Sequence, residues 1–208
     1  MTTRLIIARH GNTFGPGDTP TRVGRRTDLP LVASGEAQAR RIGDYLRRHR
    51  MVPDAVFAAP LKRSCDTARL AVEALGCDLP ITLDARFNEI DYGPDENQSE
   101  SVVIARIGEQ ALRDWNEYAK VPPGWQADPQ AIIHDWLAFG GTCRQSFSGQ
   151  TVLVVTSNGI ARFAPHLTGD FEGFRRQHGI KIATGALCFL CVQGCRWAIE
   201  QWNIRPAP

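Results

Sequence analysis

Short apolar runs that stop abruptly at polar residues recur along this chain, and they constrain its fold more than any other feature. The runs RLIIA (residues 4–8), DAVFAAP (54–60) and TVLVVTS (151–157) have the length and the continuous apolar character of buried strands. Each ends in a loop, and helical patterns follow the first two. This alternation predicts an α/β fold around a mostly parallel sheet, in which ligands bind just beyond the carboxyl ends of the strands.

The remaining elements complete one domain of 208 residues. We expect the first helix to begin at Ser34 as N-cap, and a second to span 64–75. The run PITLDARF (80–87) indicates a third strand, and two edge strands are expected at 186–192 and 197–202, joined through Gly194. The stretch 94–149 is interpreted as a helical insertion over one end of the sheet, with helices over 104–118 and 129–139.

Composition excludes some classes of partner. The net charge of +2 is too small to indicate a nucleic-acid partner, and the positive charge is almost entirely arginine, which suits bidentate recognition of phosphate or carboxylate. No run approaches the ~20 apolar residues of a membrane span, and no signal-peptide pattern opens the sequence. We therefore expect a cytoplasmic protein without a membrane partner, and the sequence leaves a homodimer open.

The cysteines are interpreted as reduced thiols, because no secretory signal accompanies them. Cys188, Cys191 and Cys195 are close in sequence, but the first two fall in the run ALCFLCV, which alternates like a strand. A zinc site would need a fourth ligand and a turn between the cysteines, so no metal site is expected there.

Polar side chains with complementary chemistry follow the predicted strands. The candidates are Arg9 and His10 after the first strand, Arg63 after the second, Glu89 after the third and Asn158 after the later buried one. Two arginines can hold a phosphoryl group bidentately while a neutral imidazole attacks phosphorus, and a protonated carboxyl group can supply the departing oxygen with a proton. Asp91, Asp95 and Glu96 remain alternative acids.

Four motifs, in order, resemble those of the histidine phosphatase superfamily, also called the phosphoglycerate mutase-like family. The string Arg9-His10-Gly11 resembles the family's RHG signature, which is weak alone. The other resemblances are GRRTDLPL with SGEAQA (24–31 and 34–39), APLKRSCDTA (59–68) and EIDYG (89–93). The family's fold, a three-layer sandwich with a central sheet, is therefore the expected one.

The resemblance implies roles for residues. His10 would be transiently phosphorylated, Arg9 and Arg63 would bind the phosphoryl group, and Glu89 would act as acid and then as base for water. Further substrate-binding residues are expected near them: Asn12, Thr13, Gly159, Arg25 and Tyr92. The implied reaction is hydrolysis of a small phosphorylated metabolite, or alternatively mutase transfer, without a metal or other cofactor.

Asn158 departs from the family pattern. Family members carry a second histidine after the later strand, in a motif like S-H-G-G, where this chain has Ser157-Asn158-Gly159-Ile160. Asparagine can donate a hydrogen bond but cannot supply positive charge, and losing one such donor costs about 100- to 1,000-fold in rate in other enzymes. A slower phosphatase, a pseudo-phosphatase that binds a phosphorylated ligand or partner, and an introduced substitution all remain open. His166 lies too far along a predicted helix to replace the missing group.

Overall fold

The first strand, β1 (Arg4–Arg9), lies inside a six-stranded sheet whose order is β3-β2-β4-β1-β5-β6. The computed structural model describes residues 2–207. The other strands are β2 (Ala55–Ala58), β3 (Ile81–Leu83), β4 (Thr151–Thr156), β5 (Leu187–Gln193) and β6 (Arg196–Ile204). The first four strands in the sheet order are mutually parallel, and β5 and β6 join antiparallel beyond β1. The predicted mostly parallel sheet is confirmed.

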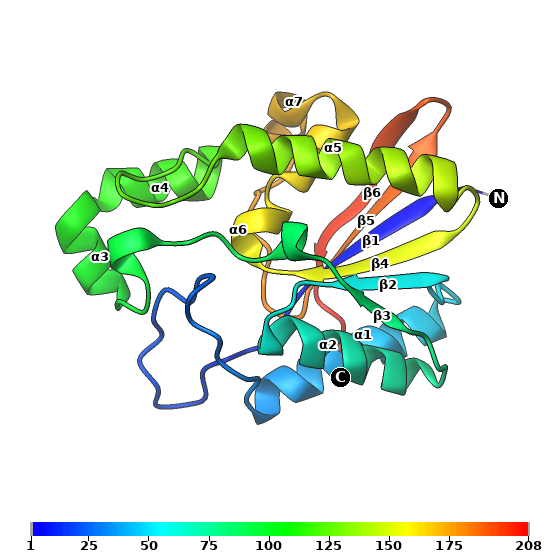
Figure 1. Cartoon of the computed structure of the whole chain (residues 1–208), viewed down its shortest axis with the longest axis horizontal. Helices are drawn as coiled ribbons and strands as arrows, with labels where there is room; N and C mark the ends of the chain where they lie inside the picture. Colours follow the sequence, from blue (N-terminus) through cyan, green and yellow to red (C-terminus); the bar gives the residue numbers. More distant parts are fainter. Residues whose placement is uncertain (1, 208) are drawn as a thin grey trace.

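Helices cover both faces of the sheet, which gives three layers (Figure 1). One face packs against α1 (Ala33–Arg48) and α2 (Lys62–Leu75), because both helices carry apolar stripes that meet the even-numbered side chains of β1. The other face packs against α5 (Pro129–Ser146), with α6 (Asn158–Ala161) and α7 (Phe171–Gln177) nearby. None of the helices within residues 2–207 is long and apolar enough to cross a membrane.

The segment between β3 and β4 contributes the rest of the helical layer. Figure 1 shows α3 (Glu100–Ile107) and α4 (Glu109–Tyr118) beyond the carboxyl ends of β1 and β4, whereas α5 runs along the face of the sheet. Three short 3-10 helices, Ala85–Phe87, Gly93–Asp95 and Ala164–Thr168, complete the connections.

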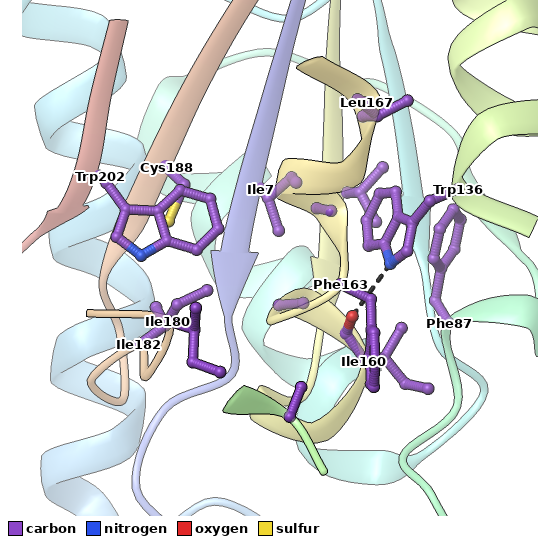
Figure 2. Packing of buried hydrophobic residues seen from close by; sticks show 14 of the residues in the cluster. Ile7, Phe87, Trp136, Ile160, Phe163, Leu167, Ile180, Ile182, Cys188 and Trp202 are labelled. Atoms are coloured by element: carbon purple, nitrogen blue, oxygen red, sulfur yellow. Dashed lines mark hydrogen bonds between the residues drawn. The ribbon is translucent and has the colours of Figure 1, made fainter. Parts of the chain in front are cut away.

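A buried aromatic contact fixes α6 to α5 (Figure 2). The indole Nε1 of Trp136 donates to the carbonyl of Ile160 at 2.9 Å, and its ring lies 5.2 Å from that of Phe87. Trp136 and Phe87 are almost completely buried, so this hydrogen bond is shielded from water. The insertion therefore holds the turn that begins at Asn158.

Several predicted boundaries are wrong. The first helix begins at Ala33 with Val32 as N-cap, and the hydroxyl of Ser34 instead accepts a hydrogen bond from Asn12 Nδ2 at 3.2 Å. The predicted helix 104–118 is two helices, because Gly108 has φ +80° and interrupts the ladder. The helix predicted over 129–139 continues to Ser146.

The prediction of two C-terminal edge strands is half right. β6 is an edge strand, but β5 lies between β1 and β6. The edge at the other end of the sheet is β3, which has only three residues. Short edge strands of this kind offer little template for pairing with another chain.

Candidate active site

A cavity of about 470 Å³ opens at the carboxyl ends of β1 and β4. Its volume falls within the range of small-molecule sites. The predicted residues that line it are Arg9, His10, Asn12, Thr13, Glu89, Tyr92 and Asn158. They come from segments far apart in the sequence, and parallel pairing of β1 with β4 brings Arg9 opposite Thr156, so the residues that follow each strand meet.

His10 is buried and neutral. Its Nδ1 lies 2.8 Å from the carbonyl oxygen of Gly11, and because a carbonyl can only accept, Nδ1 carries the proton. Burial, reinforced by the charges of Arg9 and Arg63, holds the pKa of His10 well below its ordinary value. The lone pair is therefore on Nε2, which makes this nitrogen a nucleophile at neutral pH.

The backbone around His10 is fixed by contacts that glycine alone allows. A Cβ on Gly11 would lie 2.3 Å from the carbonyl oxygen of Gly35, in the first turn of α1. The amide of Gly11 donates to Thr67 Oγ1 on α2 at 3.1 Å, and that of Asn12 donates to Gln38 Oε1 on α1 at 2.8 Å. Both helices on this face thus hold the loop that carries His10.

Arg9 and Arg63 both place positive charge near His10, but only Arg9 reaches the cavity. Arg9 lines the cavity, and its Nη1 donates to the carbonyl of Ile182 at 2.6 Å. Arg63 is fully buried and lies outside the cavity lining, with its Nη1 on the carbonyl of Thr27 at 2.8 Å and its Nη2 on that of Gly24 at 3.1 Å. Burial lowers the pKa of both. Within residues 2–207 neither forms a salt bridge, although the nearby carboxyl group of Glu89 opposes the lowering of both pKa values.

Glu89 is a buried carboxyl group in the cavity wall. Its Oε1 accepts from the backbone N–H of Ile90 at 2.9 Å, and its Oε2 accepts from that of Gly159 at 3.1 Å. A Cβ on Gly159 would lie 2.0 Å from Oε1, so this approach requires glycine. Gly159 therefore positions the carboxyl group and is outside the cavity lining itself.

The alternative acids are engaged elsewhere. Asp91 forms a salt bridge with Arg26 at 3.0 Å, and Asp95 pairs with Arg106. Glu96 accepts hydrogen bonds from the loop before α1. None of these three lines the cavity, so Glu89 is the one of the four acids considered from the sequence that does.

Asn158 lines the cavity as predicted, and Arg25 does not. The Oδ1 of Asn158 accepts from the backbone N–H of Ile182 at 2.9 Å. Arg25 is exposed and outside the lining, with its Nε 3.3 Å from the carbonyl of Glu89. Tyr92 is buried in the wall as expected, and burial raises its pKa.

Sequence reasoning missed Arg22, Trp115, Arg162 and Lys181, which also line the cavity. Arg162 is 1% exposed. It stands as the one charged residue in the apolar run IARFAP, and a lone charge in such a run is a signal that could have found it. His166 lies outside the cavity and stacks on Phe171 at 4.1 Å.

No cluster of three or more histidine, cysteine or acidic side chains within residues 2–207 could hold a metal ion. The cysteines described are all free. Cys188 and Cys191 lie on β5, as their alternating context indicates.

The family model of the histidine phosphatase superfamily (branch 1) matches residues 5–205. The chain belongs to this superfamily.

Similar curated proteins are 2,3-bisphosphoglycerate-dependent phosphoglycerate mutases. That of Bifidobacterium longum (strain NCC 2705) is 31% identical over 131 residues, 62% of this chain and 52% of the relative. Mutase 2 of Gloeobacter violaceus is 33% identical over 126 residues, 59% of this chain and 55% of the relative. The chain thus matches about half the length of these histidine phosphatase relatives.

Solved structures with the same fold match nearly the whole chain. The mycobacterial glucosyl-3-phosphoglycerate phosphatase in complex with inorganic phosphate has a TM-score of 0.77 at 18% identity, with 98% of each chain covered. The alpha-ribazole phosphatase from Shigella flexneri has a TM-score of 0.72 at 20% identity, with 99% of this chain and 98% of the other covered. At these identities the likeness establishes the histidine phosphatase fold.

Proposed function

We propose that this protein hydrolyses phosphomonoesters of small metabolites through a phosphohistidine at His10. The observation that carries the proposal is the state of His10: a neutral imidazole whose Nδ1 is bonded to Gly11, in one cavity with Arg9 and Glu89. Membership of the superfamily supports it. The solved phosphatases of the same fold are consistent with hydrolysis.

The first step transfers the phosphoryl group. Nε2 of His10 attacks phosphorus, the bond from phosphorus to the ester oxygen breaks, and Glu89 in its protonated form gives its proton to that oxygen. Arg9 and Arg63 offset the negative charge on the phosphoryl oxygens, and the buried setting strengthens this attraction. Asn12 and Thr13 lie in the same loop and are proposed to contact those oxygens.

The second step releases phosphate. Glu89, now ionised, takes a proton from water as the water oxygen attacks phosphorus. The bond from phosphorus to Nε2 breaks, and His10 returns to its neutral form. Each proton that Glu89 gives in the first step is recovered in the second, so the cycle closes with the protein unchanged.

Turnover of p-nitrophenyl phosphate by wild type and by His10→Ala tests this proposal, with inorganic phosphate measured as product. We expect wild-type turnover and an acid-labile phosphoprotein, both lost in His10→Ala. The exposed His134 offers a matched control, because His134→Ala removes an imidazole outside the cavity and should leave turnover unchanged.

The same measurements separate the alternatives. If wild type and His10→Ala are equally inert on a panel of phosphomonoesters, hydrolysis is abandoned, and phosphate-dependent binding by the wild type would then favour a pseudo-phosphatase. A phosphorylated isomer formed without release of phosphate would instead indicate a mutase, as in the curated relatives.

A further inference from the structure

Arg162 is a buried cation that has no carboxylate partner. Its Nη1 donates to the carbonyl of Trp115 at 2.5 Å and its Nε to that of Asn158 at 3.2 Å, and both acceptors are neutral. Within residues 2–207 it forms no salt bridge, although its side chain is almost completely buried and lines the cavity. Burial lowers its pKa to about 10, so it remains charged at neutral pH. A buried charge that no carboxylate contacts directly is costly, and an anionic ligand in contact with it would offset that cost.

The guanidinium of Arg162 is held rigidly. Its carbon atom lies 3.8 Å from the centre of the Trp115 ring, and two donors are fixed by the hydrogen bonds above. The other amino group, Nη2, forms no hydrogen bond with any described residue. A stacked and doubly bonded arginine loses little rotational freedom when it binds an anion, which favours tight and specific recognition.

The guanidinium of Arg162 lies against α4. It donates to the carbonyl of Trp115 on that helix and stacks on the ring of the same residue. Figure 1 shows α4 beyond the carboxyl ends of β1 and β4, whereas His10 directly follows β1. In-line attack places the leaving oxygen opposite the nucleophile, next to the acid. Arg162 therefore faces the alcohol portion of the substrate.

Two more cations, Arg22 and Lys181, line the same cavity. Glu100 also lines it, but this carboxylate is exposed and lies 3.8 Å from Arg22. Positive charge exceeds negative charge among the lining residues, which include Arg9, Arg22, Arg162 and Lys181 against Glu89 and Glu100. On this observation, which rests on the proposed function, we propose that Arg162 binds a second anionic group, carboxylate or phosphate, on the substrate's alcohol portion.

The test compares matched esters that differ in that group. The pairs are 3-phosphoglycerate with glycerol 3-phosphate and 4-carboxyphenyl phosphate with phenyl phosphate, assayed with wild type, Arg162→Met and Arg162→Lys. We expect the wild type to prefer the anionic member at least about tenfold in kcat/KM, as for a hydrogen bond to a charged group. Arg162→Met should remove most of this preference, and Arg162→Lys should retain part of it.

Arg175 supplies the matched control, because it also stacks on an aromatic ring, 4.2 Å from that of Tyr118, but outside this cavity. Arg175→Met should keep the wild-type preference. Equal losses on both members of a pair in Arg162→Met, or no preference in the wild type, would overturn the proposal.

Failure of hydrolysis is distinguishable from failure of this inference. If no ester is turned over, calorimetric titration of the same esters into wild type and Arg162→Met still measures the preference. Tighter binding of the anionic member by about tenfold, lost in Arg162→Met, supports the subsite in a binding protein. Equal affinities overturn it, and unfolding temperatures confirm that each variant is folded.

Discussion

Ile182 holds two side chains of the cavity wall through its backbone polar groups. Its N–H donates to Asn158 Oδ1 at 2.9 Å, and its carbonyl accepts from Arg9 Nη1 at 2.6 Å. Asn158 therefore holds the segment that positions one of the two arginines proposed to bind phosphate. Asn158, the residue that departs from the family motif, therefore positions a neighbouring segment. A contact with phosphate alone would not explain its hydrogen bond with Ile182.

Replacement of Asn158 separates this task from charge. In Asn158→Ala the buried N–H of Ile182 loses its acceptor, which should cost about 1–2 kcal/mol of stability and raise KM through displacement of Arg9. Asn158→Asp keeps the acceptor but adds negative charge, so stability should hold while kcat/KM falls. Urea unfolding and steady-state kinetics measure the two effects. Wild-type stability and KM in Asn158→Ala would refute the positioning role.

Residues in the site were predictable to the extent that they follow strands directly. His10 and Glu89 enter one cavity because parallel strands end at one edge, which a sequence pattern reveals. Arg63 was also placed near them, but its depth depends on backbone carbonyls of the loop before α1. The inward orientation of Arg162 depends on Trp115, 47 residues away in sequence, and no local pattern encodes that contact.

At the scale of elements, Glu96 holds the loop 21–27, of which residues 21–23 line the cavity. Glu96 Oε1 accepts from the backbone N–H of Gly24 and of Arg26, both at 3.0 Å, and from Thr27 Oγ1 at 2.8 Å. The same loop supplies the carbonyls that bind Arg63. The carboxylate of Glu96, which lies outside the cavity, thus fixes the loop whose carbonyls hold Arg63.

Glu96→Ala should therefore affect both stability and catalysis. Loss of several hydrogen bonds to one carboxylate should lower the free energy of unfolding by about 3 kcal/mol and reduce kcat/KM as Arg63 loses its anchors. Glu96→Gln, which keeps the shape and part of the bonding, should lie between this variant and wild type. Glu117→Ala, at an exposed position, is the control. A Glu96→Ala protein with wild-type kinetics would show that the loop is held by other contacts.

Element types were easier to predict than their limits. Long apolar runs identified β1, β2 and β4, because a strand that is buried on both faces has a continuous run of apolar residues. The break between α3 and α4 at Gly108 was not predictable, because the helical periodicity continues through this glycine in the sequence. The interior position of β5 was not predictable for a different reason. Strand order depends on which strands pack together, and the apolar alternation of a strand does not identify its neighbours.

Global stability should depend on pH through the buried His10 and the half-buried His166. Burial lowers the pKa of His10 and of His166 in the folded protein, so below pH ~6.5 the unfolded chain binds more protons. Stability is then fully present above that pH and declines as pH falls, for His10 by up to about 1.4 kcal/mol per pH unit. Urea unfolding between pH 7.5 and 5.5 should show this decline, reduced in His10→Gln and further in His10→Gln/His166→Phe. An identical slope in all three proteins would contradict the assignment.

The position of β1 between β4 and β5 has a consequence for how the molecule is made. Synthesis produces β1 first, but its two neighbours begin only at residues 151 and 187. At roughly 5–20 residues per second, the apolar strand waits on the order of ten seconds on the ribosome without either partner. Until then the residues that follow β4 are missing, so a nascent chain carries Arg9 and His10 without a cavity. The yield of folded protein thus depends on shielding RLIIA from other chains during that interval.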